Sequence, residues 1–83
     1  MASRLNKRRK PEEWERVIIT VIRASRVEAN LTRQELADRM GLSHHQIINL
    51  EHGRRSVRLS DFIPLADAIG VDPVKLFERI ARW

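Results

Sequence analysis

Side chains that can form hydrogen bonds with nucleic-acid bases occur together in the segment HHQIIN, residues 44–49. Asparagine and glutamine can each pair with N6 and N7 of adenine, and an exposed aliphatic side chain can contact the methyl group of thymine. Neutral histidine can donate to or accept from guanine or a phosphate, and at about pH 6.5 it gains a positive charge. The candidate residues for reading base edges are therefore His44, His45, Gln46, Ile48 and Asn49.

Other interpretations of the same side chains stay open. Gln46 follows Ser43 at the spacing of a capping box, so its amide could be occupied by the backbone instead of facing outward. Ile48 could pack against a protein partner or be partly buried. The histidines and the asparagine could form an ordinary polar helix face.

Two short helical patterns separated by a glycine contain these residues. Thr32 with Glu35, and Ser43 with Gln46, have the spacing of a capping box, so each pattern begins with its own cap. Gly41 ends the first helix, because glycine readily adopts the positive φ that a helix end requires. The link that follows is so short that the two helices must cross at a steep angle. The second helix would then protrude and be able to enter the major groove of DNA.

Three further helical patterns flank this pair, and no strand pattern is present. The expected helices cover about residues 11–29, 33–40, 44–52, 61–69 after a cap at Ser60, and the residues from Pro73 onward. The sequence therefore predicts an all-α fold, a compact five-helix domain over residues 11–83. A flexible basic arm over residues 1–10 would precede it.

The net charge of +5 is concentrated in this arm. Residues 1–10 contain five basic side chains and no acid, whereas the remaining eleven basic residues balance the eleven acidic ones. The arm could follow the minor groove or the phosphates of adjacent DNA, or it could be a solubilising tail. Its basic residues are Arg4, Lys7, Arg8, Arg9 and Lys10.

Several classes of protein are excluded by composition and spacing. There is no cysteine, and the three histidines include no pair at the i, i+4 spacing of a helical zinc site, so we expect no metal and no cofactor. No nucleophile–base pairing or glycine-rich phosphate loop is recognisable, so we expect no enzymatic activity. The apolar runs are too short to cross a membrane and no signal peptide is present, which predicts a soluble cytoplasmic protein.

Four short motifs follow one another along the chain. They are LTxxELA from residue 31, GxS from residue 41, IxxLExG from residue 47 and LAxAIGV from residue 65. In this order and spacing the chain resembles the Cro/C1-type (XRE) helix-turn-helix family, which has a five-helix, lambda-repressor-like domain, over about residues 14–80. Its small size and its segment 71–77 are also similar to the controller proteins of restriction–modification systems, which are compact dimeric regulators.

The resemblance implies roles for two groups of residues. His44, His45 and Asn49 match the main base-contact positions of the family. Arg26 and Glu51 match a partly buried ion pair between the first helix and the end of the third. Glu51 would then fix the reading helix without touching a base.

The resemblance also implies contacts with the DNA backbone. The family commonly has glutamine beside a phosphate at the position of Arg33, and a guanidinium group can grip a phosphate as well. The family usually has a small or polar residue where this chain has Ile48. The other expected phosphate contacts are Ser43, Arg54, Arg55 and Arg58, although one of the three loop arginines is expected to be merely solvated.

One reading helix covers only about 4–5 base pairs, which is too few for useful specificity. A two-fold dimer would place two such helices about 34 Å apart, on successive faces of the major groove. The expected dimer surface is the last helix with the end of the fourth helix, because the last helix has more apolar side chains than a small core can accommodate. Its expected contact residues are Val74, Phe77 and Trp83, unless Trp83 folds back on Trp14 or on the core of its own chain.

The sequence therefore predicts a sequence-specific transcriptional regulator that binds double-stranded DNA as a homodimer on an inverted-repeat operator. It would act by occupying a promoter as a repressor or by contacting RNA polymerase, and its concentration and cooperative binding would regulate it. One alternative is a protein-interaction module, an antitoxin or antiactivator, with Ile48 and Phe77 in a heteromeric interface. Another is a nonspecific nucleoid or RNA-binding protein that uses mainly the basic arm.

Overall fold

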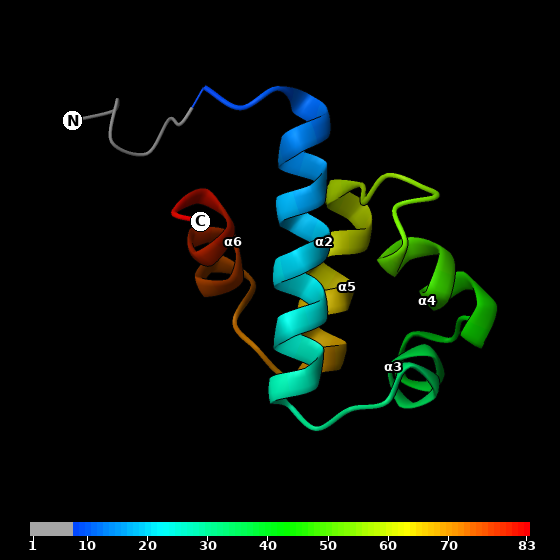
Figure 1. Cartoon of the computed structure of the whole chain (residues 1–83). Helices are drawn as coiled ribbons and strands as arrows, with labels where there is room; N and C mark the ends of the chain where they lie inside the picture. Colours follow the sequence, from blue (N-terminus) through cyan, green and yellow to red (C-terminus); the bar gives the residue numbers. More distant parts are fainter. Residues whose placement is uncertain (1–7) are drawn as a thin grey trace.

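The computed structural model describes residues 8–83, which contain five helices, labelled α2 to α6. They are α2 (Pro11–Glu28), α3 (Arg33–Met40), α4 (His44–Glu51), α5 (Leu59–Ile69) and α6 (Pro73–Ala81). The long helix α2 runs through the middle of the molecule, with α3 and α4 on one side, α6 on the other and α5 behind it (Figure 1). No strand occurs between residues 8 and 83, so the all-α five-helix fold is confirmed.

The two predicted capping boxes are present at the starts of α3 and α4. The Thr32 hydroxyl accepts the Glu35 N–H at 3.0 Å, and the Glu35 carboxylate accepts the Thr32 N–H at 2.8 Å. Ser43 and Gln46 form the same reciprocal pair at 3.1 and 2.8 Å. Gly41 ends α3 with a φ of 69°, in the left-handed region. Local hydrogen bonds thus set both ends of the tight connection from α3 to α4.

The start of α5 differs from the prediction. The sequence analysis placed a cap at Ser60, whereas α5 begins at Leu59 with Arg58 in the capping position. No side chain caps this helix from the preceding residue. Instead, the Asp61 carboxylate in the first turn accepts the Arg58 N–H at 3.0 Å. The predicted ends of α2 and α4 were each one residue too late, since these helices end at Glu28 and Glu51.

The buried apolar side chains form two clusters that meet at α2. The first joins α2 to α3, α4 and α5, and consists of Ile22, Leu36, Ala37, Ile47, Leu50, Leu65, Ala68 and Ile69. The second joins α2 to α5 and α6, and consists of Val17, Val21, Phe62, Ala66, Leu76 and Ile80. Because α2 contributes to both clusters, it fixes the position of α4 relative to α6.

A group of three charged side chains ties α4 to α2 and α3. The Glu51 carboxylate accepts from Arg26 Nε at 2.7 Å and from Arg33 Nε at 2.9 Å, and its side chain is 0% exposed. Arg26 also donates to the Leu31 carbonyl at 2.7 Å. Burial alone would raise the pKa of the Glu51 carboxyl, but the hydrogen bonds from Arg26 and Arg33 lower it below its ordinary value. Glu51 is therefore charged in the folded protein, and its contribution to stability is lost as the pH falls through this lowered pKa.

Removing this carboxylate should destabilise the fold. We expect Glu51→Ala to lower the free energy of unfolding by about 3 kcal/mol, because it leaves the buried Arg26 without its counter-ion. Urea denaturation and the melting temperature measure the change. Glu78→Ala, which removes an exposed carboxylate on α6, is the control and should have little effect. An unchanged melting temperature for Glu51→Ala would contradict the role assigned to the ion pair.

Candidate nucleic-acid interface

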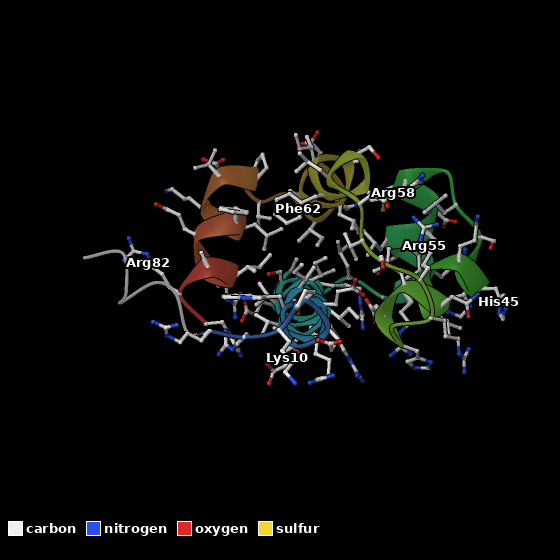
Figure 2. The ribbon with its side chains drawn as sticks, turned by 90° about the horizontal axis from the view of Figure 1, so that it is seen from above. Lys10, His45, Arg55, Arg58, Phe62 and Arg82 are labelled. Atoms are coloured by element: carbon white, nitrogen blue, oxygen red, sulfur yellow. The ribbon has the colours of Figure 1, made fainter. Side chains whose placement is uncertain are left out.

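The first turn of α4 forms the outer edge of the molecule. His44, His45 and Gln46 are exposed, while Ile47, Leu50 and Glu51 on the other side of the helix are buried. Figure 2 shows His45 pointing outward at the end of the molecule remote from α6. The helix therefore presents a polar edge to solvent and is held from behind by its own apolar face.

Two of the candidate base-reading side chains, Ile48 and Asn49, are half-buried and not fully exposed. Ile48 is neither buried in the core nor fully exposed, which matches one of the three interpretations left open by the sequence. Asn49 is also half-buried, and its Oδ1 atom accepts a hydrogen bond from Nη1 of Arg54 at 3.0 Å. This bond fixes the amide of Asn49 against the loop that follows α4.

Gln46 serves as a cap. Its Oε1 atom accepts the Ser43 N–H at 2.8 Å, and the Ser43 hydroxyl accepts the Gln46 N–H at 3.1 Å. The capping box predicted from the sequence therefore engages the amide oxygen of Gln46. The amide nitrogen of Gln46 takes no part in it. Ser43 itself is exposed at the start of α4, where a phosphate would meet the positive end of the helix dipole.

The three loop arginines have different partners. Arg55 and Arg58 both contact the carboxylate of Asp61, at 2.9 Å and 3.4 Å, while Arg54 contacts Asn49. Burial would raise the pKa of Asp61, but hydrogen bonds from the Arg58 backbone and from the two guanidinium groups lower it. The Arg58 side chain is 72% exposed and that of Arg55 is 35% exposed, so Arg58 is the more accessible to an external anion. Figure 2 places both at the α4–α5 side of the molecule.

Arg33 has a contact that the sequence analysis missed. Besides lying at the start of α3, it donates to the buried Glu51 and keeps a side-chain exposure of 29%. The residue type could have indicated this contact. The family commonly has an uncharged glutamine at this position, whereas the arginine of this chain can pair with an acid on the next helix. Arg33 thus links the start of α3 to the end of α4.

The described part of the basic arm lies near α6, away from α4. Arg9 stacks on the Trp14 ring, with its guanidinium carbon 4.8 Å from the ring centre, and donates to the Trp83 carbonyl at 3.1 Å. Lys10 is the residue that caps α2. Arg8 is exposed, whereas Arg4 and Lys7 lie outside the described residues. Arg9 therefore has a structural contact that its position in a charged run did not reveal.

An apolar surface lies on the other side of the molecule, over α5 and α6. Val74 and Phe77 of α6 are 66% and 60% exposed, and Trp83 is 43% exposed. Leu59 and Ile63 of α5 are exposed as well, at 74% and 50%. The apolar patch, as we call it below, consists of Leu59, Ile63, Val74 and Phe77. The sequence analysis expected the end of α5 to contribute to this surface, and it missed Leu59, which it placed before the helix, and Ile63.

A hollow of about 210 Å³ adjoins the apolar patch. Its walls include Leu59, Phe62 and Phe77, and the two phenylalanine rings meet edge to face with their centres 6.4 Å apart. Figure 2 shows Phe62 between α5 and α6. Phe77 is thus anchored on one side by an aromatic contact and exposed on the other.

The described residues show two further absences. No group of three or more side chains suited to bind a metal occurs among residues 8–83. None of the helices α2 to α6 is long and apolar enough to cross a membrane.

Comparison with known proteins identifies the family. The helix-turn-helix family profile matches residues 22–76. An uncharacterized HTH-type transcriptional regulator of Methanothermobacter thermautotrophicus is 41% identical over 56 residues, which cover 68% of this chain and 81% of that protein.

Two solved structures have the same fold. An XRE-family like protein from Pseudomonas syringae pv. tomato has a TM-score of 0.79 at 23% identity, over 83% of this chain and 84% of that one. The clp gene regulator ClgR from C. glutamicum has a TM-score of 0.74 at 22% identity, over 82% and 88%. With the family match, the geometry of α3 and α4 and the exposed edge of α4, the chain belongs to the XRE-type helix-turn-helix family of DNA-binding transcriptional regulators.

Proposed function

We propose that the protein recognises a specific inverted-repeat operator as a homodimer, with α4 of each subunit in the major groove. The observation that carries this proposal is the orientation of α4. Its polar first turn is exposed while Ile47, Leu50 and Glu51 hold its opposite face in the core. A helix mounted in this way presents its N-terminal side chains to base edges. His44, His45, Gln46, Ile48 and Asn49 are the proposed base contacts.

Phosphate contacts would flank this helix on both sides. Arg33 and Ser43 lie at the starts of α3 and α4, where helix dipoles favour an anion. Arg54, Arg55 and Arg58 follow α4 and would hold the next stretch of backbone. The guanidinium groups of Arg33 and Arg55 are held by Glu51 and Asp61, so less conformational entropy is lost when they bind a phosphate.

The apolar patch supports the homodimer. Four large apolar side chains exposed on two adjacent helices are more than a small domain usually leaves in water. A second copy of the chain presents the same patch, as a two-fold interface requires. Repression by occupying a promoter and activation by contacting RNA polymerase are both compatible with such a dimer.

A protein-interaction module on the same fold is the second candidate, and the exposed Phe77 favours it as much as it favours a homodimer. The two candidates differ in what they bind. The regulator has a preferred duplex and pairs with itself, whereas an antitoxin-like or antiactivator-like module pairs with another protein and has little specific affinity for DNA.

Selection from a pool of random duplexes tests the proposed function. We expect the bound duplexes to share an inverted repeat whose halves are about ten base pairs apart, the spacing of two major-groove faces on one side of the helix. A pool without a shared sequence would refute sequence-specific binding. A single half-site would refute the two-fold dimer on DNA.

The apolar patch can be tested by adding charge to it. Phe77→Asp and Val74→Asp should each give a monomer in analytical ultracentrifugation and weaken operator binding at least about tenfold, because the two half-sites are then bound independently. Lys75→Asp changes an exposed residue of the same helix outside the patch and should remain dimeric. If Val74→Asp and Phe77→Asp also stay dimeric while folded, another surface forms the dimer.

The exposed loop arginine gives a prediction about salt. We expect Arg58→Ala to weaken binding to all duplexes alike and to reduce the slope of log K against log salt by about 1, because one phosphate contact is lost. Arg82→Ala, which removes an exposed charge from the end of α6, is the matched control and should leave the slope unchanged. An equal slope in wild type and Arg58→Ala would mean that Arg58 contacts no phosphate.

A further inference from the structure

The two carboxamide side chains of α4 both have their oxygen atoms engaged within the protein. Oε1 of Gln46 accepts the Ser43 N–H at 2.8 Å. Oδ1 of Asn49 accepts from the guanidinium group of Arg54 at 3.0 Å. A carboxamide held by its oxygen directs its NH₂ group away from that contact. Each amide is therefore positioned to offer a ligand its hydrogen-bond donors.

The rest of α4 strengthens this donor character. Its single carboxylate, Glu51, is 0% exposed and is bound by Arg26 and Arg33. The helix has no acidic residue in its first turn, and its dipole places partial positive charge there. Arg54 adds a full positive charge beside Asn49. The acceptors that the exposed side chains of the first turn still offer are the imidazole rings of His44 and His45 and the second lone pair of the Gln46 amide oxygen.

Bases differ in how well they match such an edge. In the major groove, guanine presents two acceptors, N7 and O6, whereas adenine presents one acceptor and one amino donor. A free asparagine pairs with adenine because its oxygen accepts from N6 while its nitrogen donates to N7. That pairing would require Oδ1 of Asn49 to accept a second hydrogen bond beside the one from Arg54, and the arginine's positive charge disfavours an amino group at this place.

We propose that Asn49 reads DNA as a hydrogen-bond donor, and that the base facing it in each half-site is guanine instead of adenine. Arg54 is the positioning residue, because it holds the oxygen of Asn49 and leaves the NH₂ group to the base. Gln46, whose oxygen accepts the Ser43 N–H, likewise offers its NH₂ group to a base as a hydrogen-bond donor. This inference rests on the proposed function and defines the class of operator that the dimer binds.

The position read by Asn49 is found first. In selected duplexes, it is the base pair whose preference is abolished by Asn49→Ala. Competition binding with the four bases at this position then measures the preference. We expect wild-type protein to prefer guanine over adenine by about tenfold or more, and to bind 7-deazaguanine, which lacks the N7 acceptor, more weakly than guanine.

Arg54→Ala tests the positioning role. Freed of the arginine, Asn49 can pair with adenine through both of its amide groups, so the ratio of guanine to adenine binding should fall at least about fivefold, towards or past unity. Arg58→Ala is the matched control. It removes a loop arginine that contacts Asp61 and not Asn49, so it should weaken both duplexes equally and leave the ratio unchanged. Melting temperatures verify that all variants fold.

The outcomes separate this inference from the proposed function. Adenine at the Asn49 position of a specifically bound duplex overturns the inference and leaves the regulator intact. An unchanged ratio in folded Arg54→Ala overturns the role of Arg54. A protein without any preferred duplex overturns both the inference and the function on which it rests.

Discussion

The carboxylate of Glu51 lies inside the molecule, and guanidinium groups from α2 and α3 keep it charged there. Because Glu51 is the last residue of α4, these two ion pairs attach that helix to α2 and α3, in addition to the packing of Ile47 and Leu50 in the core. Burying a charge is costly unless it is paired and fully hydrogen-bonded, so a shifted α4 would leave a carboxylate and Arg26 unsatisfied. The apolar face of α4 could tolerate small rotations, whereas three hydrogen bonds with fixed directions could not. The ion pairs and the apolar face of α4 together therefore determine which of its side chains face outward.

The two core clusters support the two surfaces that are proposed to bind DNA and a second copy of the chain. α4 protrudes on one side of α2, and the apolar patch of α5 and α6 lies on another (Figures 1 and 2). α2 takes part in both clusters, so α4 and the apolar patch belong to one packed unit. If the patch is the dimer surface, the spacing between two copies of α4 is set by packing and needs no flexible linker.

Local structure was predictable from the sequence, whereas long-range pairing was predicted only where the family resemblance implied it, as for Arg26 and Glu51. The start of α4 follows from Ser43 and Gln46, because a capping box involves only neighbouring residues. The start of α5 was predicted wrongly because Asp61 in the first turn accepts the N–H of Arg58, which moves the capping position ahead of Ser60, and Asp61 also gains contacts with the loop arginines. The pairing of Arg33 with Glu51 and the contacts of Arg9 depend on helices meeting in space. The roles of the candidate base contacts depend on DNA, and they stay predictions.

Net charge is a poor guide to the surface that would meet DNA, because much of the positive charge is used inside the protein. The Glu28 carboxylate neutralises Arg79 through two bonds of 2.9 Å, and Arg39 donates to a backbone carbonyl at the end of α5. Arg26 and Arg33 share a single acid. These arginines hold helices together. Glu28 cancels the charge of Arg79, whereas Arg39 and the group formed by Arg26, Arg33 and Glu51 each keep one net positive charge. Recognition, as proposed, would depend on the exposed donors at the edge of α4 and on the loop arginines, which stay at least partly exposed despite their contacts with Asn49 and Asp61. If these groups read DNA as proposed, the hydrogen bonds that stabilise the fold also fix their arrangement, and the choice of base would be decided largely before DNA arrives.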